Sequence, residues 1–184
     1  MNRFHRTALL AAVLPLAWAS HASAQMGQMS HGNAVMDAVR ANLTRSARTM
    51  VAAAEAMPAD KYGYKPTDGQ RSFGEIVSHV AGSNNFMCST LSGVDAPKAK
   101  VPDGSASKDA LVAAVKASYE FCTRALANVT DANLGDMVQY FGNRQVTRAT
   151  AAVGVSDDWA DHYGQLAMYL RLNGILPPTA RRGM

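Results

Sequence analysis

Apolar residues recur every three or four positions along four long segments of this 184-residue chain. Such spacing places them on one face of an α-helix, so each segment predicts an amphipathic helix that must bury that face. The first segment runs from Ala34 to about Met57 without proline or glycine, and Pro58 ends it. Four such helices in one chain of this length predict an all-α four-helix bundle around a single core.

The start of each later helix is indicated by capping residues. Ser72 and Glu75 fit a capping box at the start of a second helix, which extends to about residue 91. Ser107 is the expected N-cap of a third helix, which reaches about residue 126. The residues expected to face the core are Val35, Val39, Leu43, Ala47, Met50 and Ala54 in the first helix, Phe73, Val77, Val80, Asn84, Met87 and Leu91 in the second, Leu111, Val115, Tyr119, Cys122 and Leu126 in the third, and Val155, Trp159, His162, Leu166 and Tyr169 in the last.

The stretch between the third and last helices has no helical periodicity. Gly135 and Gly142 bracket the sequence MVQYF, which predicts either a short strand or an extended crossover. The last helix covers at least residues 156–173. A start near Thr147 stays open, because Gly154 would then lie inside the helix.

Residues 1–24 have the pattern of a secretory signal peptide. A positively charged start precedes an apolar run over residues 8–19, and Ala22-Ser23-Ala24 fits the site that signal peptidase cleaves. The apolar run is shorter than the roughly 20 residues that a membrane anchor needs, and a proline interrupts it. We therefore predict a mature protein that begins at Gln25 and is periplasmic or secreted.

The mature chain is expected to divide into a flexible arm (25–33), the bundle (34–178) and a tail (179–184). Loss of Arg3 and Arg6 with the leader lowers the formal net charge from +4 to +2. This balance favours no nucleic-acid partner, and no later apolar stretch predicts a stable membrane anchor. A small-molecule substrate is the expected partner, and a homodimer stays open.

Histidine is the residue type that most indicates chemistry. Of the three histidines in the mature chain, His31 lies in the predicted arm, His79 in the second helix and His162 in the last. Asp158 precedes His162 by four positions, which places both on one helical face. Together with His79 they would supply two imidazoles and a carboxylate, a set that suits zinc or another divalent first-row ion. Alternatively, the histidines pack at the core edge and Asp158 is a charge near the helix start.

No other motif offers a competing chemistry. The chain has no serine-nucleophile elbow, phosphate-binding glycine loop or zincin sequence. The arginines of the last third of the chain are scattered and are expected to be solvated: Arg144, Arg148, Arg171, Arg181 and Arg182.

Two separated blocks of the sequence resemble the DinB-like superfamily. They are MPADKYGYKPTDGQRSFGEIVSHVAGSNNFMCS (57–89) and DHYGQLAMYLRLNGILPP (161–178). The matching positions are Met57, Pro58, Tyr62, Tyr64, Pro66, Arg71, Phe73, Gly74 and His79 in the first block, and His162, Tyr163, Gly164, Gln165, Tyr169, Arg171, Gly174, Pro177 and Pro178 in the second. With the number of helices, the resemblance covers nearly all of the mature chain.

The resemblance implies an up-down-down-up bundle in which three histidines hold a divalent metal ion, most often nickel or zinc. His79 and His162 match the first and third ligands, whereas Asp158 stands where many members have histidine. The resemblance leaves the reaction open. The first hypothesis is a metal-dependent hydrolase of unknown substrate, in which the ion lowers the pKa of a bound water and Asp158 is a ligand or a general base. The alternative is a non-catalytic exported stress or binding module with a degenerate metal site. Thiol-dependent transfer, known among relatives, needs a cytosolic thiol that an exported protein would not meet.

The resemblance also bears on the two cysteines. Export permits a disulfide between Cys88 and Cys122, but strictly antiparallel second and third helices would place these residues at opposite ends of the bundle. The implied up-down-down-up order makes those helices parallel and brings the cysteines to one level, so we predict a bridge. Two buried free thiols are the alternative.

Overall fold

The computed structural model describes residues 31–181, and this part of the chain contains four long helices. They are α1 (Ala34–Ala56), α2 (Phe73–Ser92), α3 (Lys108–Leu126) and α4 (Arg148–Leu172). The predicted signal peptide, residues 25–30 of the predicted arm and residues 182–184 lie outside the described residues. Within residues 31–181, no helix combines the length and hydropathy that crossing a membrane requires.

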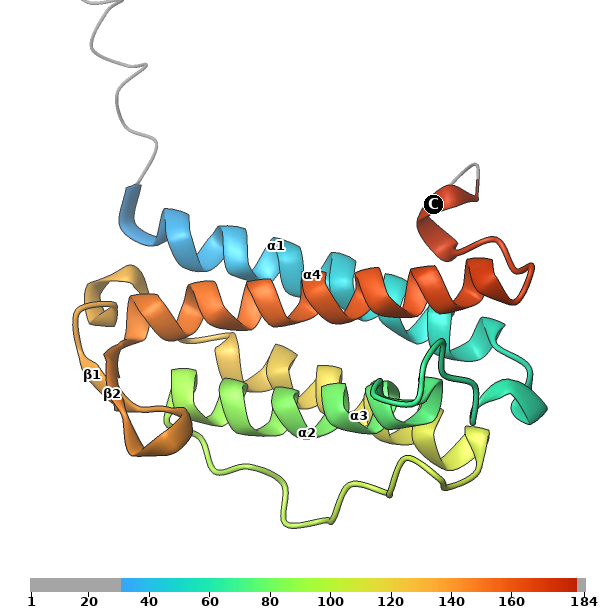
Figure 1. The fold of residues 1–184 in the computed structure, drawn as a ribbon. Helices are drawn as coiled ribbons and strands as arrows, with labels where there is room; N and C mark the ends of the chain where they lie inside the picture. Colours follow the sequence, from blue (N-terminus) through green and yellow to red (C-terminus); the bar gives the residue numbers. More distant parts are fainter. Residues whose placement is uncertain (1–30, 182–184) are drawn as a thin grey trace, which may run out of the picture. The chain divides into compact units, whose positions relative to one another are not determined.

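The four helices form a bundle in which α1 and α4 run in one direction and α2 and α3 run in the other (Figure 1). The connection between α2 and α3 travels back along the bundle, which makes these two helices parallel (Figure 1). Cys88 and Cys122 therefore lie at the same level and form a disulfide, with a Cα–Cα distance of 5.2 Å. The expected four-helix fold, its up-down-down-up order and the bridge are confirmed.

Side-chain caps explain where the helices begin. The Ser72 hydroxyl accepts from the Glu75 amide at 3.2 Å, and the Glu75 carboxylate accepts from the Ser72 amide at 2.5 Å, as a capping box requires. Ser107 caps α3 and Thr147 caps α4. The last helix therefore has the longer of the two predicted extents, with Gly154 inside it.

The start of α1 is capped by a residue from far along the chain. Asp131 accepts hydrogen bonds from the amides of Val35 and Met36, each at 2.9 Å. A carboxylate at this position also complements the positive end of the helix dipole. Val35 was expected in the core but is 44% exposed, and Met36 is fully buried instead. Both residues lie one turn before Val39, so spacing alone could not separate them.

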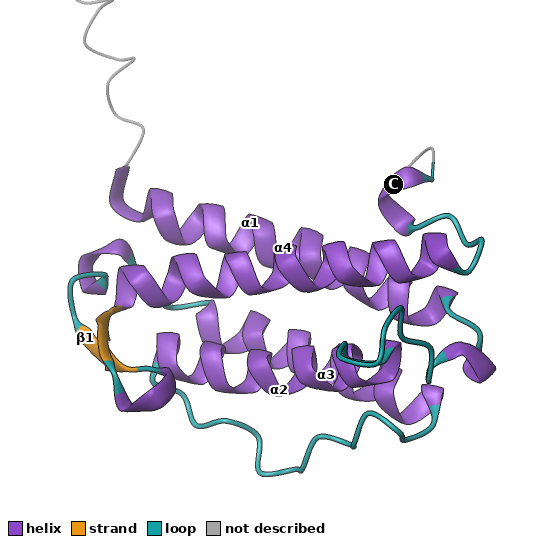
Figure 2. Ribbon diagram, viewed as in Figure 1, coloured by secondary structure: helices purple, strands orange, loops and turns teal. Residues whose placement is uncertain are grey.

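A small hairpin occupies the connection between α3 and α4. Strand β1 (Met137–Gln139) pairs antiparallel with β2 (Gln145–Thr147), at the end of the bundle where α4 begins (Figure 2). The strand expected within MVQYF is confirmed, and its partner strand was not predicted. Arg148, expected to be solvated, instead donates to the Leu91 carbonyl and lies 3.7 Å from the carboxylate of Asp136, which joins the hairpin side to the end of α2.

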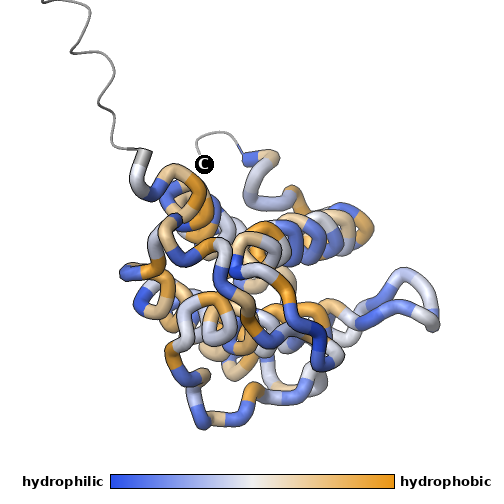
Figure 3. The backbone as a smooth tube through the Cα atoms, turned by 90° about the vertical axis from the view of Figure 1, so that its left-hand side faces the viewer, coloured by the Kyte–Doolittle hydropathy of each residue, from blue (hydrophilic) through white to orange (hydrophobic). Residues whose placement is uncertain are grey.

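The core lies between the four helices, and each helix alternates hydrophobic and hydrophilic residues around its circumference (Figure 3). Asn84 is a polar residue of this core and is fully buried. Its side chain donates to Ser118 at 3.0 Å and accepts from the Trp159 indole at 2.7 Å. These two bonds join α2 to α3 and α4 and satisfy a polar group that would otherwise be costly to bury.

Candidate metal centre

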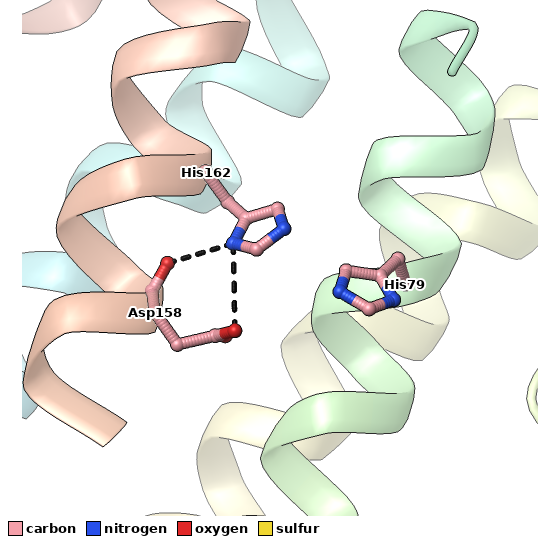
Figure 4. A group of neighbouring side chains, drawn as sticks. All are labelled: His79, Asp158 and His162. Atoms are coloured by element: carbon pink, nitrogen blue, oxygen red, sulfur yellow. Dashed lines mark hydrogen bonds and ion pairs between the residues drawn. The ribbon is translucent and has the colours of Figure 1, made fainter. Parts of the chain in front are cut away.

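Three predicted site residues come together between α2 and α4. His79 projects from α2 toward Asp158 and His162, which lie one turn apart on α4 (Figure 4). One ligand atom from each residue lies within 4.8 Å of the others. The rings of His79 and His162 have centroids 4.7 Å apart. The spacing-based prediction and the position implied by the resemblance therefore lead to the same cluster.

His162 is held in a fixed orientation by its own helix. Its Nδ1 lies 2.8 Å from the Asp158 carbonyl oxygen, one turn earlier, and its side chain is 8% exposed. A carbonyl can only accept, so this contact places the proton on Nδ1. The lone pair is then on Nε2, the nitrogen that can bind a metal ion, while the Nδ1 contact orients the ring as metal-bound histidines commonly require.

His79 is half-buried and lies opposite. Its Nε2 is 3.4 Å from the Ser83 hydroxyl, one turn later on α2. Burial lowers the pKa of His79, and the charge of Arg71 and the neighbouring His162 ring lower it further. The imidazole is therefore neutral at neutral pH, which is the form that ligates a metal ion.

Asp158 contributes a carboxylate that its surroundings do not satisfy. Its Oδ1 lies 3.5 Å from Nδ1 of His162, whereas its Oδ2 is buried and has no hydrogen-bond partner among the described residues. Burial raises the pKa of Asp158, although the charge of His162 opposes that rise. A cation beside Oδ2 would compensate for this desolvation. The two imidazoles and one carboxylate therefore fit a divalent ion with further positions open.

Two charged residues adjoin the cluster and were not predicted as site residues. Asp161 lies with its Oδ2 3.9 Å from Nδ1 of His162. The charge of Arg71 lowers the pKa of both His79 and Asp158, so this residue also lies near the centre. Arg71 was noted only as one position of the matched sequence pattern, and Asp161 is a neighbour of His162 in sequence. Neither has a spacing signal that would separate it from an ordinary surface charge.

The hairpin approaches the same region from another side. Tyr140 packs beside Phe86 and Phe141, with ring centroids 6.3 and 4.8 Å away. Burial raises the pKa of Tyr140, and the Asp158 carboxylate raises it further. Its hydroxyl lies against Gly154, where a Cβ would be only 2.5 Å away. Gly154 precedes Asp158 by one turn, so the glycine makes room for a phenol near the centre.

Comparisons with known proteins identify the family and agree with the four-helix fold. The family model described as the DinB superfamily matches residues 42–166, a span that contains all three clustered residues. A DinB-like protein from Bacillus subtilis is similar in structure, with a TM-score of 0.62 and 19% identity over 79% of this chain and 99% of that chain. A DinB-like protein from Bacillus cereus has a TM-score of 0.65 and 15% identity over 77% and 95% of the two chains. A conserved protein from Enterococcus faecalis has a TM-score of 0.61 and 20% identity over 75% and 96%. A search of the curated proteins found no match.

Proposed function

Since this chain belongs to the DinB superfamily, we propose that it binds a divalent metal ion through His79, Asp158 and His162. Zinc or nickel is the proposed ion, because both accept imidazole nitrogen. The observation that carries the proposal is the buried Oδ2 of Asp158, which has no hydrogen-bond partner within residues 31–181 although two imidazoles lie within reach of the same carboxylate. A cation bound here would supply the missing interaction.

We propose further that the centre serves a hydrolytic reaction on a small-molecule substrate. Three protein ligands leave room for a water molecule and a substrate oxygen. A divalent ion at such a site lowers the pKa of water and polarises a substrate oxygen. In this chain His79, Asp158 and His162 would hold the ion.

A non-catalytic exported stress or binding module is the second candidate. It is favoured by Asp158, a carboxylate where the resemblance implies a third histidine. A degenerate centre of this kind would retain the bundle and would bind a metal ion weakly or without turnover.

Metal analysis separates these candidates. Protein purified without added metal should contain about one equivalent of zinc or nickel by elemental analysis, and H79A and H162A should each lose it. H31A is the matched control, because His31 lies outside residues 42–166, the span that the family model matches. Retention of the metal by H162A would refute the centre. A loaded protein without activity toward a panel of esters, amides and phosphoesters would favour the binding module.

We also propose that the protein is exported and cleaved after Ala24. The disulfide between Cys88 and Cys122 supports an oxidising compartment, and the leader pattern supports the route. N-terminal sequencing of the protein recovered from its natural host should begin at Gln25. Recovery of the intact leader in a membrane fraction would refute this proposal.

A further inference from the structure

An open groove runs along the outside of α4 beside the candidate centre. One wall is the segment that precedes α2, including Pro66 and Arg71, and the other is the second half of α4. Asp161 lines the groove, and its Oδ2 lies 3.9 Å from Nδ1 of His162. One end of the groove therefore adjoins the place where the metal ion is proposed.

The two ends of the groove differ in polarity. Asp161 and Gln165 lie at the end near the centre and are joined by a 2.9 Å hydrogen bond. Met168 and Leu172 follow on the same face of α4 and are 56% and 54% exposed. Two large apolar side chains in a row, one turn apart, provide a surface for an alkyl or aryl group. The groove is therefore amphipathic along its length.

Arg71 supplies a charge that no acidic partner neutralises. Among the described residues, none of the ion pairs within 4.0 Å involves its guanidinium. Its backbone is nevertheless fixed, because the Tyr169 hydroxyl on α4 donates to the Arg71 carbonyl at 2.9 Å. An arginine whose backbone is anchored in this way is suited to a planar oxyanion, which its guanidinium can bind through two parallel hydrogen bonds.

Gly164 keeps the floor of the groove open. It lies inside α4, where glycine costs about 1 kcal/mol relative to alanine. A Cβ added there would meet nothing within 4 Å, so packing within the fold does not require this glycine. Its absent side chain instead leaves space in the groove between Asp161 and Met168.

We propose that this groove binds a small amphipathic oxyanion, a carboxylate or a phosphate ester, whose charged group is held by Arg71 and whose apolar part lies on Met168 and Leu172. The inference rests on the proposed function, since it makes the groove the substrate site of the same centre. It adds the substrate class: a molecule with an anionic group beside the bond to be cleaved and a hydrocarbon or aromatic remainder.

The test is calorimetric titration of the zinc-loaded protein with octanoate, octyl phosphate, octanol and octylamine. Octanoate or octyl phosphate should bind at least about tenfold more tightly than octanol and octylamine, because the charge-assisted contact to Arg71 is available only to an anion. Acetate should bind more weakly than octanoate, since it cannot reach the apolar end. Comparison of the two octyl anions shows whether the natural group is a carboxylate or a phosphate.

Variants locate the binding. R71Q should weaken octanoate binding about tenfold or more, R71K should weaken it less, and G164L should abolish it by filling the groove. R48Q is the matched control, an exposed arginine on α1 that should leave binding unchanged. The G164L side chain points into open space, so the thermal unfolding midpoint should not fall.

Two outcomes would overturn the inference: equal octanoate affinity in the wild type and R71Q, or unchanged affinity in G164L. Metal content is measured on the same samples and reports separately on the proposed function. R71Q and G164L should retain the metal. If only H79A and H162A lose the metal and R71Q binds octanoate as tightly as the wild type, the metal centre is supported and the proposed groove site is refuted.

Discussion

Gly154 offers a sharp test of how the hairpin is placed against the centre. In the interior of α4 an alanine should be more stable than this glycine by about 1 kcal/mol. A Cβ at residue 154, however, would lie 2.5 Å from the Tyr140 hydroxyl oxygen and 3.5 Å from its Cζ atom. The first distance is a clash, and the second is an ordinary contact. The conflict therefore comes from a single oxygen atom.

In a double-mutant cycle, G154A should therefore destabilise the wild type and stabilise the Y140F variant. In the wild-type background, G154A must push the Tyr140 ring away from its packed position, and overpacking of this kind costs about 1–3 kcal/mol. Because the gain in helix propensity offsets part of this cost, G154A should lower the free energy of unfolding by about 1 kcal/mol. In the Y140F background the clashing oxygen is absent, so G154A should stabilise by about 1 kcal/mol. The expected coupling energy is therefore about 2 kcal/mol.

Urea unfolding followed by circular dichroism gives the four free energies of unfolding. G164A is the control, because a Cβ at Gly164 meets nothing within 4 Å and should stabilise both backgrounds by about 1 kcal/mol. If G154A stabilises the wild type and Y140F equally, Tyr140 does not lie against α4, and the approach of the hairpin to Asp158 is refuted.

The remaining predictions concern the centre and the disulfide. Burial raises the pKa of Asp158 above 3.8, so in EDTA its stabilising contribution is present below that value and is lost as pH rises through the raised pKa. At pH 7, D158N should therefore unfold at a higher temperature than the metal-free wild type while it binds zinc more weakly, and D157N, on the exposed adjacent residue, should change neither. Replacing Cys88 and Cys122 by serine opens a link across 34 residues and should lower the free energy of unfolding by about 4 kcal/mol, measured in urea. Dithiothreitol should destabilise the wild type by a similar amount and leave the double variant unchanged.

The helices could be predicted from sequence because their signals are local. Apolar spacing and caps at Ser72 and Ser107 involve residues within a turn or two of each other, and the structure has the helices there. The hairpin could be predicted only in part, because β2 consists of three residues with no buried side chain. The cap of α1 by Asp131 joins residues 96 positions apart, and no local sequence pattern predicts such a contact.

For the candidate centre too, local spacing predicted one part and tertiary packing determined the rest. The pairing of Asp158 with His162 follows from a spacing of four on one helix. Their meeting with His79 depends on which face of α2 turns toward α4. Spacing within one helix does not determine this, so the grouping with His79 was a hypothesis that the resemblance then supported. The groove had no signal at all, because Arg71 and Asp161 resemble ordinary surface charges until the segment before α2 is seen beside α4.

Asp158 connects the metal centre with the groove through charge. A divalent ion held by two neutral imidazoles and one carboxylate keeps a formal charge of about +1, compared with about +2 for three imidazoles, so it attracts an anionic substrate less strongly. Arg71 adds a further positive charge at the edge of the same site, close enough to lower the pKa of Asp158 and His79. Asp158 therefore lowers the attraction of the centre for an oxyanion, and the guanidinium of Arg71 restores part of that attraction. The substitution D158H should therefore reduce the loss of octanoate affinity that R71Q causes in the zinc-loaded protein.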